Sequence, residues 1–294
     1  MLPGLSFENI SVDDISFFYN DKIKVHVLRL DKISPLVSGN KWFKLRYYLE
    51  EAKAQHKKGI LTFGGAWSNH IVATAAICHM HGFRSIGLIR GEAPDKLSAT
   101  LIQAKELGMQ LFFISRTAYR NKEIPASLNT GEYYMINEGG YGKTGAEGAS
   151  TLLDYCKESY THYCCAVGTG TMMAGLINAV LPPQQVLGIS VMKNNTAREE
   201  MVSALVNDEK TNWELLHDYH FGGYAKHQPA LFDFMNEFYE QTGIPTDFVY
   251  TAKLFYALSD LARKNYFPPG SKLLAIQSGG LQGNISLPEG TLIF

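Results

Sequence analysis

Ser38-Gly39-Asn40-Lys41 is the stretch around which the chain is organised. It follows an apolar, strand-like run from Lys24 to Leu30 and precedes a helix-like run from Trp42 to Gln55. A lysine on a small turn between two such elements can be held facing a cleft, where its amine acts as a base or attacks a carbonyl group. Most lysines in such turns are simply solvated, so the catalytic interpretation depends on the rest of the chain.

The composition is that of an ordinary globular protein. The chain has 294 residues, 46% of them apolar and 19% charged, a length that suits about two domains or one large one. A formal net charge of −1 leaves no strong field to attract nucleic acid or an anionic membrane. No apolar run is long enough to cross a bilayer, and residues 1–14 do not have the pattern of a signal peptide. We therefore expect a cytoplasmic protein without nucleic-acid or membrane partners.

The cysteines and histidines show no metal pattern. The spacing of Cys78, Cys156, Cys164 and Cys165 fits neither a zinc ribbon nor a redox pair, so they are predicted to be reduced core residues. His79 and His81 are two positions apart and do not share a helix face, so no metal site is expected.

Strand-like and helix-like segments alternate from residue 60 onward. Strands are predicted at 60–63, 85–89, 110–114, 163–167, 186–192 and 272–276. Helices are predicted at 70–80, 94–107, 146–156, 172–180, 197–206, 229–241 and 250–265. Such alternation predicts an α/β protein with a mostly parallel sheet that helices cover on both faces. Residues 44–135 read as a small α/β unit.

Gly168-Thr169-Gly170-Thr171 is the best candidate for a phosphate site. It joins a buried strand to a helix, so it belongs to the carboxyl edge of a parallel sheet, where ligands bind. Its glycines allow close approach of the backbone, and the helix start offers free N–H groups. It is neither a Walker sequence nor the spaced dinucleotide fingerprint. A plain capped turn is the alternative interpretation.

Two further strand-to-helix turns carry hydroxyl groups. Ser68-Asn69 opens a helix and would bind a carboxylate, although ordinary capping is the alternative. Ser278-Gly279-Gly280 follows the last strand and would offer a hydroxyl to a ring nitrogen. Tyr224 and Tyr250 lie upstream as aromatic partners, but with 16 tyrosines in the chain most are core residues. A lysine, a phosphate site, a carboxylate site and ring partners are together what pyridoxal phosphate needs to act on an amino acid.

The sequence resembles the pyridoxal-phosphate enzymes of the tryptophan-synthase-β fold, fold type II. Within them it is similar to the 1-aminocyclopropane-1-carboxylate deaminase/D-cysteine desulfhydrase family. The resemblance runs from about residue 25 to 280, and its most specific segments are SGNKWFKL at 38–45, GGAWSNH at 64–70, VYTAK at 249–253 and QSGG at 277–280. It implies two open, mostly parallel twisted sheets flanked by helices. The cofactor would lie in the cleft between a small domain, 44–135, and a large, discontinuous domain, 1–43 and 136–294, and the protein would be a homodimer.

The resemblance also implies a role for each matching residue. Lys41 would hold the cofactor through a Schiff base, and Asn69 would bond to its phenolic oxygen. Ser68 would lie at the substrate carboxylate or relay a proton, with Asn69 and His70 completing the substrate site. The turn at 168–171 would bind the phosphate.

The ring environment departs from the deaminase pattern. Tyr224 and Tyr250 match family tyrosines beside the cofactor and substrate, but Thr251 replaces a glutamate and Ser278 a leucine, as in the family's D-cysteine desulfhydrases. A neutral hydroxyl at the pyridine nitrogen leaves that nitrogen largely unprotonated, which weakens the ring as an electron sink. Opening a cyclopropane that has no α-hydrogen needs the stronger sink more than β-elimination does.

The sequence therefore predicts a pyridoxal-phosphate-dependent lyase or deaminase of a small amino acid. The favoured reaction is D-cysteine desulfhydrase-like β-elimination to pyruvate, ammonia and sulfide, with Lys41, Ser68, Tyr224 or Tyr250 handling the α-proton. Ring opening of 1-aminocyclopropane-1-carboxylate to 2-oxobutanoate and ammonia is the alternative within the family. A protein that binds the cofactor without turnover, or an unrelated nucleotide-binding protein, is the alternative outside it.

Overall fold

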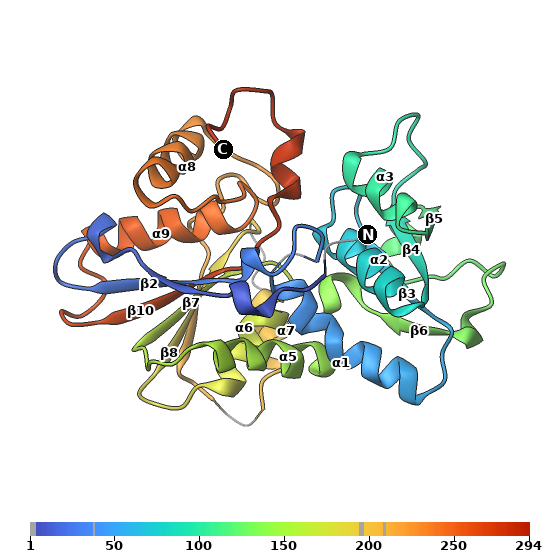
Figure 1. The fold of residues 1–294 in the computed structure, drawn as a ribbon, viewed down its shortest axis with the longest axis horizontal. Coiled ribbons are helices and arrows are strands. Elements are labelled where there is room, and N and C mark those ends of the chain that lie inside the picture. The colour runs from blue at the N-terminus through green and yellow to red at the C-terminus, as the bar shows by residue number, and fades with distance from the viewer. Residues whose placement is uncertain (1–3, 38, 194–196, 208–209) are drawn as a thin grey trace.

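The computed structural model describes residues 4–37, 39–193, 197–207 and 210–294, so Ser38 lies outside the described part of the chain. The chain forms two sheets flanked by helices, one of six strands and one of four (Figure 1). All strand pairs are parallel except β1–β2, so the predicted fold class is confirmed. Among the described residues, no helix combines the length and the apolar character that crossing a membrane requires.

The larger sheet joins the two ends of the chain. Its strand order is β1 (Val12–Asp14), β2 (Lys24–Arg29), β10 (Lys272–Gln277), β7 (His162–Val167), β8 (Gln185–Ser190) and β9 (Trp213–Leu216). Strand β10 lies between β2 and β7, with Gln277 opposite Arg29. The carboxyl end of β10 therefore lies beside the segment that leads from β2 to Lys41.

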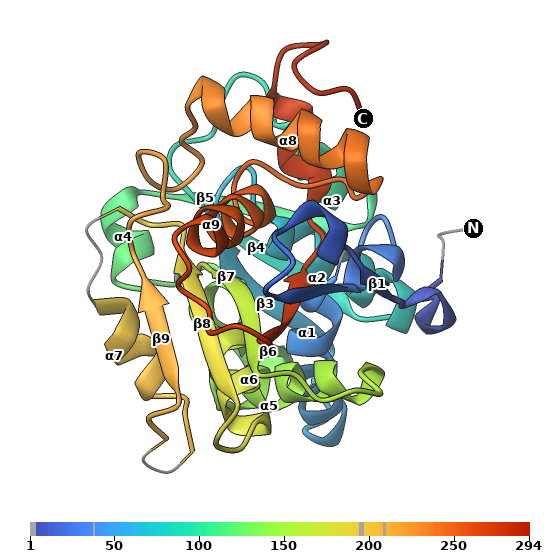
Figure 2. The same ribbon diagram turned by 90° about the vertical axis from the view of Figure 1, so that its left-hand side faces the viewer.

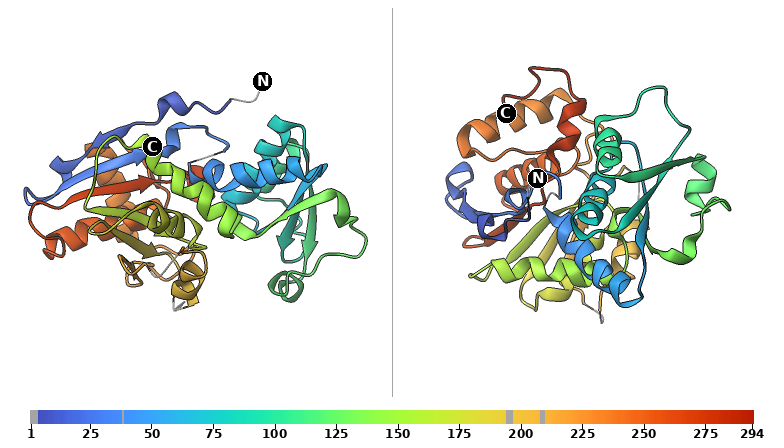
Figure 3. Two further views of the ribbon diagram at one scale, coloured as in Figure 1. Left: turned by 90° about the horizontal axis from the view of Figure 1, so that it is seen from below. Right: turned by 45° about the vertical axis from the view of Figure 1, so that its right-hand side comes forward.

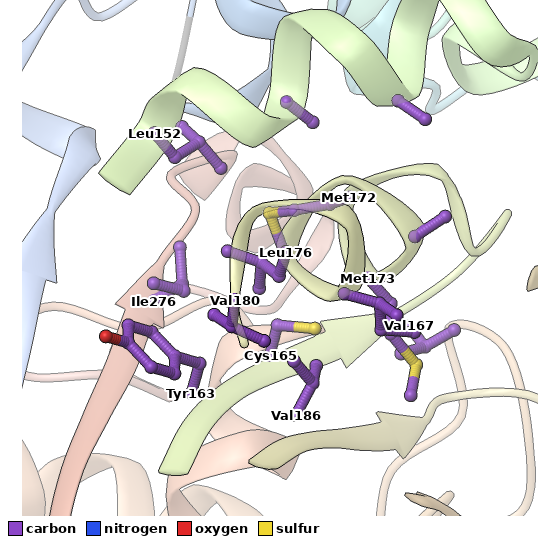
Figure 4. Packing of buried hydrophobic residues seen from close by; sticks show 14 of the residues in the cluster. Leu152, Tyr163, Cys165, Val167, Met172, Met173, Leu176, Val180, Val186 and Ile276 are labelled. Atoms are coloured by element: carbon purple, nitrogen blue, oxygen red, sulfur yellow. The ribbon is translucent and has the colours of Figure 1, made fainter. Parts of the chain in front are cut away.

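Helices cover both faces of this sheet (Figure 2). Helices α5 (Lys143–Ser150) and α6 (Thr171–Ala179) pack on one face, and α8 (Pro229–Thr242) and α9 (Thr251–Arg263) on the other. Met172 and Leu176 of α6, with Val180 just after it, pack with Cys165 and other side chains of the sheet (Figure 4). Neighbouring residues of β7 point to opposite faces, which is why Cys164 belongs to the other core and both cysteines are buried and free. Helix α7 (Ala197–Ser203) packs against α6.

The smaller sheet has the order β5 (Met109–Ile114), β4 (Arg84–Arg90), β3 (Gly59–Gly64) and β6 (Tyr133–Ile136). One face of this sheet is covered by α2 (Asn69–His81) and α3 (Ala99–Glu106), and the opposite face by α4 (Arg116–Arg120).

Helix α1 (Asn40–Ala54) joins the cores of the two sheets (Figure 3). Its Phe43 packs in the core of the larger sheet, whereas Leu45, Tyr48 and Leu49 pack in that of the smaller one. The division into domains at 43/44 and 135/136 stays a prediction.

Several predicted boundaries were wrong. The helix predicted from Pro94 begins at Ala99, because Ser98 is the residue whose hydroxyl accepts the Leu101 N–H and caps it. The helix predicted at 146–156 begins at Lys143 and changes to a 3-10 helix at Thr151. The short strands β1, β6 and β9 and the helix α4 were not predicted. Elements of three to five residues show too little periodicity to be recognised.

Candidate functional site

The turn that carries Lys41 is pressed against the end of β10. Gly39 has φ 55° and ψ −125°, a conformation open to glycine. A Cβ atom at Gly39 would lie 1.8 Å from the main-chain oxygen of Ser278, and the Asn40 N–H donates to that oxygen over 3.2 Å. The structure therefore brings Lys41 and Ser278, 237 positions apart in the sequence, to the same place.

Lys41 lies in the first turn of α1, partly buried. Its Nζ donates to Asn40 Oδ1 over 2.7 Å, and the buried Asn40 amide in turn contacts Met172 Sδ of α6. Burial lowers the pKa of Lys41 to about 8, and the charge of Asp247 opposes part of that decrease. A larger share of the side chain is therefore present as the neutral, nucleophilic amine at physiological pH than for an ordinary lysine.

The predicted phosphate turn lies against the other glycine-rich stretch, 137–142. A Cβ atom at Gly139 would lie 2.7 Å from Thr169 Cγ2, so these two turns are in direct contact. Thr169 and Thr171 share a hydrogen bond of 3.0 Å between their hydroxyls. Gly170 has φ 87° and caps α6, whose first N–H groups have no helical partner. This arrangement is suited to an anion.

Lys44 is a buried lysine that sequence analysis did not single out. It lies one turn after Lys41, and none of the ion pairs between described residues includes it. Burial lowers its pKa well below the usual value, and the neighbouring Lys41 charge adds to the decrease. A Cβ atom at Gly140 would lie 3.2 Å from Lys44 Cβ, so the lysine adjoins the glycine-rich stretch. The available signal was a lysine on the apolar face of a predicted amphipathic helix, between Phe43 and Leu45.

Two polar groups at the start of α2 have no side-chain hydrogen bond of the expected kind within the described part of the chain. Ser68 occupies the N-cap position, but its side chain makes no capping hydrogen bond. Asn69 Nδ2 donates to Gly280 O over 3.1 Å, which ties α2 to the turn after β10. Asn69 Oδ1 is buried and has no partner among the described residues. A hydroxyl and an amide oxygen are thus available at this turn.

His70, a predicted substrate-binding residue, lies in the core of the smaller sheet. Its Nε2 lies 2.8 Å from Thr62 Oγ1, which donates its own hydrogen to Ile136 O, so Nε2 is the protonated nitrogen. Burial lowers the pKa of His70 to about 3, and the charges of Lys41 and Lys44 contribute. His70 is therefore neutral, and its Nδ1, for which no described residue provides a partner, is an acceptor.

Asp247 organises the start of α9, and sequence analysis missed it. Its carboxylate accepts from the N–H groups of Val249, Tyr250 and Thr251 and from the Thr251 hydroxyl, over 2.8–3.0 Å. Thr251 is completely buried, and its hydroxyl also accepts the Asp247 N–H. The Thr251 side chain is therefore engaged with Asp247, so it is not free for a ring nitrogen. No sequence pattern distinguished this aspartate from a surface one.

Tyr250 connects α9 to the phosphate turn. A Cβ atom at Gly168 would lie 3.0 Å from Tyr250 Cε1, and the Tyr224 ring packs edge-on against Tyr250 with centroids 6.0 Å apart. Burial raises the pKa of Tyr250 well above its usual range, and the nearby Tyr224 adds to the increase. Both hydroxyls are therefore protonated at neutral pH.

Comparison with known proteins identifies the family to which this site belongs. The family model described as pyridoxal-phosphate dependent enzyme matches residues 20–279. This chain belongs to that family. A putative 1-aminocyclopropane-1-carboxylate deaminase of Pyrococcus abyssi is 30% identical over 289 residues, with 89% of this chain and 86% of the relative covered. A D-cysteine desulfhydrase of Klebsiella pneumoniae is 23% identical over 281 residues, with 86% of each chain covered.

Solved structures agree with this assignment of the fold. The crystal structure of an ACC deaminase homologue has a TM-score of 0.82 and 26% identity, and the match covers 96% of this chain and 93% of the homologue. The structure of O-ureido-L-serine synthase has a TM-score of 0.68 at 14% identity, covering 95% of this chain and 91% of its own, a similarity of fold alone.

The residues present fit pyridoxal phosphate. The partly buried Lys41 amine is suited to the aldehyde, and the unpartnered Asn69 amide oxygen is a free polar group at the same turns. The buried Lys44 has no carboxylate partner among the described residues, and it adjoins the glycine-rich stretch that contacts the 168–171 turn, so its side chain is suited to an anion. This pyridoxal-phosphate enzyme thus collects an aldehyde partner and an anion site from both sheets.

Proposed function

We propose that this pyridoxal-phosphate enzyme is a lyase that eliminates the β-substituent of a small amino acid, with D-cysteine as the substrate. One molecule each of D-cysteine and water would give pyruvate, hydrogen sulfide and ammonia. The relatives named D-cysteine desulfhydrase and 1-aminocyclopropane-1-carboxylate deaminase support this class of reaction.

Four side chains of the site have separate roles in the proposed reaction. The Lys41 amine holds the cofactor aldehyde and, once displaced by the amino acid, takes the α-proton. The Ser68 hydroxyl and the N–H groups at the start of α2 bind the substrate carboxylate. The Tyr224 and Tyr250 hydroxyls, protonated at neutral pH, donate to the leaving group. When bound, pyridoxal phosphate withdraws electrons from the α-carbon.

A second set of residues holds the cofactor. The turn at 168–171, the N–H groups at the start of α6 and the Lys44 side chain, whose charged form a bound anion would favour, would hold its phosphate. The Asn69 Nδ2 group, which has a second hydrogen besides the one bonded to Gly280 O, would donate to its phenolic oxygen, and the Ser278 hydroxyl would lie at its ring nitrogen.

The observation that favours elimination is the serine at the end of β10. Its main-chain oxygen accepts the Asn40 N–H, so Ser278 adjoins the lysine turn. The other candidate ring partner is Thr251. Asp247, the carboxylate nearest to Thr251 in the sequence, already accepts four hydrogen bonds at the start of α9. A neutral hydroxyl keeps the ring nitrogen largely unprotonated, which suffices for losing a good leaving group from the β-carbon.

Steady-state assays of the protein loaded with pyridoxal phosphate test the proposal. We expect D-cysteine to give pyruvate and sulfide in equal amounts, and Lys41→Ala to lose both this turnover and the visible absorbance of the lysine-bound cofactor. Lys53→Ala, on the far end of α1, serves as the control. Full turnover by Lys41→Ala would contradict the assigned role of the lysine.

Ring opening is the second candidate, because several relatives carry the deaminase name. 1-Aminocyclopropane-1-carboxylate and water would then give 2-oxobutanoate and ammonia. Formation of 2-oxobutanoate at a rate equal to or above that of pyruvate from D-cysteine would replace our proposal with this one.

A further inference from the structure

Lys253 is a buried lysine that the proposed chemistry does not use. It lies in the first turn of α9 and is completely buried. Its Nζ donates to the main-chain oxygens of His220 and Gly223, over 2.9 and 2.8 Å. Burying an ammonium group is costly unless its hydrogens are bonded, so these two carbonyl groups determine where the side chain rests. The lysine therefore fixes one backbone segment.

That segment has an unusual backbone. Phe221, Gly222, Gly223 and Ala225 have φ values of 51°, 96°, 121° and 53°. Two of the four carry side chains, for which a positive φ is unfavourable. Such a conformation persists only where surrounding contacts hold it. We call residues 220–225 the tyrosine segment, because Tyr224 lies within it.

Lys253 joins two consecutive turns of the tyrosine segment. His220 O accepts the Gly223 N–H over 3.0 Å, and Gly223 O accepts the Lys226 N–H over 3.1 Å. Each of these carbonyl oxygens uses its second lone pair for the Lys253 ammonium. Hydrogen bonds from a charged donor are stronger than neutral ones. One ammonium thus holds both turns at once.

Helix α9 holds the segment at a second point. The Phe221 ring packs edge-on against Tyr256, with ring centroids 4.8 Å apart. Tyr256 lies three residues after Lys253, on the same face of the helix. The backbone and one side chain of the tyrosine segment are therefore both attached to α9.

The held residue faces the candidate site. Tyr224 packs against Tyr250, which itself adjoins Gly168 of the phosphate turn. We propose that Lys253 is a positioning residue, whose two bonds to the tyrosine segment keep Tyr224 at the active site. The role of Tyr224 in turnover rests on the proposed function, whereas the attachment of the segment does not.

Hydrogen exchange tests the attachment without any substrate. Lys253→Met keeps the length of the side chain and removes its donors, and Lys264→Met at the exposed end of α9 is the matched control. We expect the amides of residues 222–226 to exchange about tenfold faster in Lys253→Met, while those of β7 and β10 and the Lys264→Met protein stay unchanged. Unchanged exchange at 222–226 would overturn the proposal. Should the Met variant not fold, Lys253→Gln, which keeps a short donor, carries the same comparison.

Kinetics test the link to Tyr224. For Lys253→Met we expect kcat for D-cysteine to fall about tenfold with the cofactor absorbance band retained. In a Tyr224→Phe background the same change should have little further effect, because both act through one hydroxyl. Independent, multiplicative losses would overturn the positioning role. Absence of turnover in the unaltered protein would count against the proposed function, and the exchange experiment would still decide on Lys253.

Discussion

Close contacts around single glycines build the site at the scale of the residue. At Gly39, Gly139 and Gly168 the chain approaches so closely that a Cβ atom would lie 3.0 Å or less from Ser278, Thr169 and Tyr250 respectively. Each contact joins segments far apart in the sequence. Because glycine has no Cβ atom, the lysine turn, the phosphate turn and the tyrosines can contact one another.

Gly39→Ala should weaken both stability and cofactor loading. The new Cβ would overlap Ser278 O in addition to imposing a positive φ, so we expect a loss of about 3 kcal/mol or more in the free energy of unfolding. Gly82→Ala is the control, because Gly82 also has a positive φ but has no atom within 4 Å of its Cβ position. It should cost about 1 kcal/mol. Urea denaturation measures the free energy of unfolding of both variants. Equal losses would show that the contact with Ser278 is unimportant.

Attachment of the cofactor should follow the titration of Lys41. Because the neutral amine is the nucleophile, the rate should rise about tenfold per pH unit and level off above the lysine pKa, which is about 8. Stopped-flow absorbance of cofactor-free protein mixed with pyridoxal phosphate between pH 6.5 and 9.5 measures this rate. Nα-acetyl-lysine under the same conditions corrects for titration of the cofactor. A corrected rate that still rises tenfold per unit at pH 9.5 would contradict a lowered pKa.

At the scale of the element, the start of a helix has different uses in this chain. Helices α3 and α4 begin with serines whose hydroxyls cap the backbone, whereas α2 begins with Ser68, whose hydroxyl does not. Helix α9 is capped by Asp247 through three backbone N–H groups. Ser68 therefore has a hydroxyl at a helix start that the helix backbone does not use, and this helix start belongs to the candidate substrate site.

Ser68→Ala should therefore reduce turnover without loosening the fold. We expect kcat/KM for D-cysteine to fall about tenfold or more, with the free energy of unfolding changed by less than about 0.5 kcal/mol. Ser115→Ala, which removes the capping bond to Ala118 N, should show the reverse, a stability loss of about 0.5–1 kcal/mol with normal turnover. A comparable loss of stability in Ser68→Ala would indicate an ordinary structural serine.

At the scale of the whole molecule, the site draws on both sheets. Ser68 and Asn69 follow β3 of the smaller sheet, while the turn at 168–171 and Ser278 follow β7 and β10 of the larger one. The side-chain bond from Asn69 Nδ2 to Gly280 O links the start of α2, which follows the smaller sheet, to the turn after β10 of the larger one. A cofactor bound by all of them should strengthen the association of the two sheets.

Pyridoxal phosphate should therefore raise the melting temperature of the cofactor-free protein. At a free concentration about 100 times Kd, binding adds about 2.7 kcal/mol, which corresponds to a rise of several degrees. Pyridoxal, which lacks the phosphate, should give a smaller rise, because the 168–171 turn and Lys44 would have no anion to bind. Thermal melting monitored by fluorescence measures both, and equal rises would argue against the phosphate site.

Sequence patterns determined the fold class and most of the candidate residues. Alternating apolar strands and helices are local signals, and they sufficed to predict a mostly parallel α/β protein, whereas the division into two sheets came from the family resemblance. The glycine-rich turn at 168–171 and the lysine turn at 38–41 were recognised because the residues that characterise each turn are adjacent in the sequence. Short elements such as β1 and α4 were missed because three to five residues carry too little periodicity.

Only the tertiary structure decided which polar side chains are free. Thr251 and Ser278 looked equivalent in sequence, but the Thr251 hydroxyl is taken by Asp247. Lys44 and Lys253 were not singled out in the sequence, and only the structure shows that both are buried. Burial and hydrogen-bond partners depend on residues distant in the chain, so local sequence cannot supply them. The physical reason is that a pKa and a free lone pair are properties of the folded surroundings, not of the residue type.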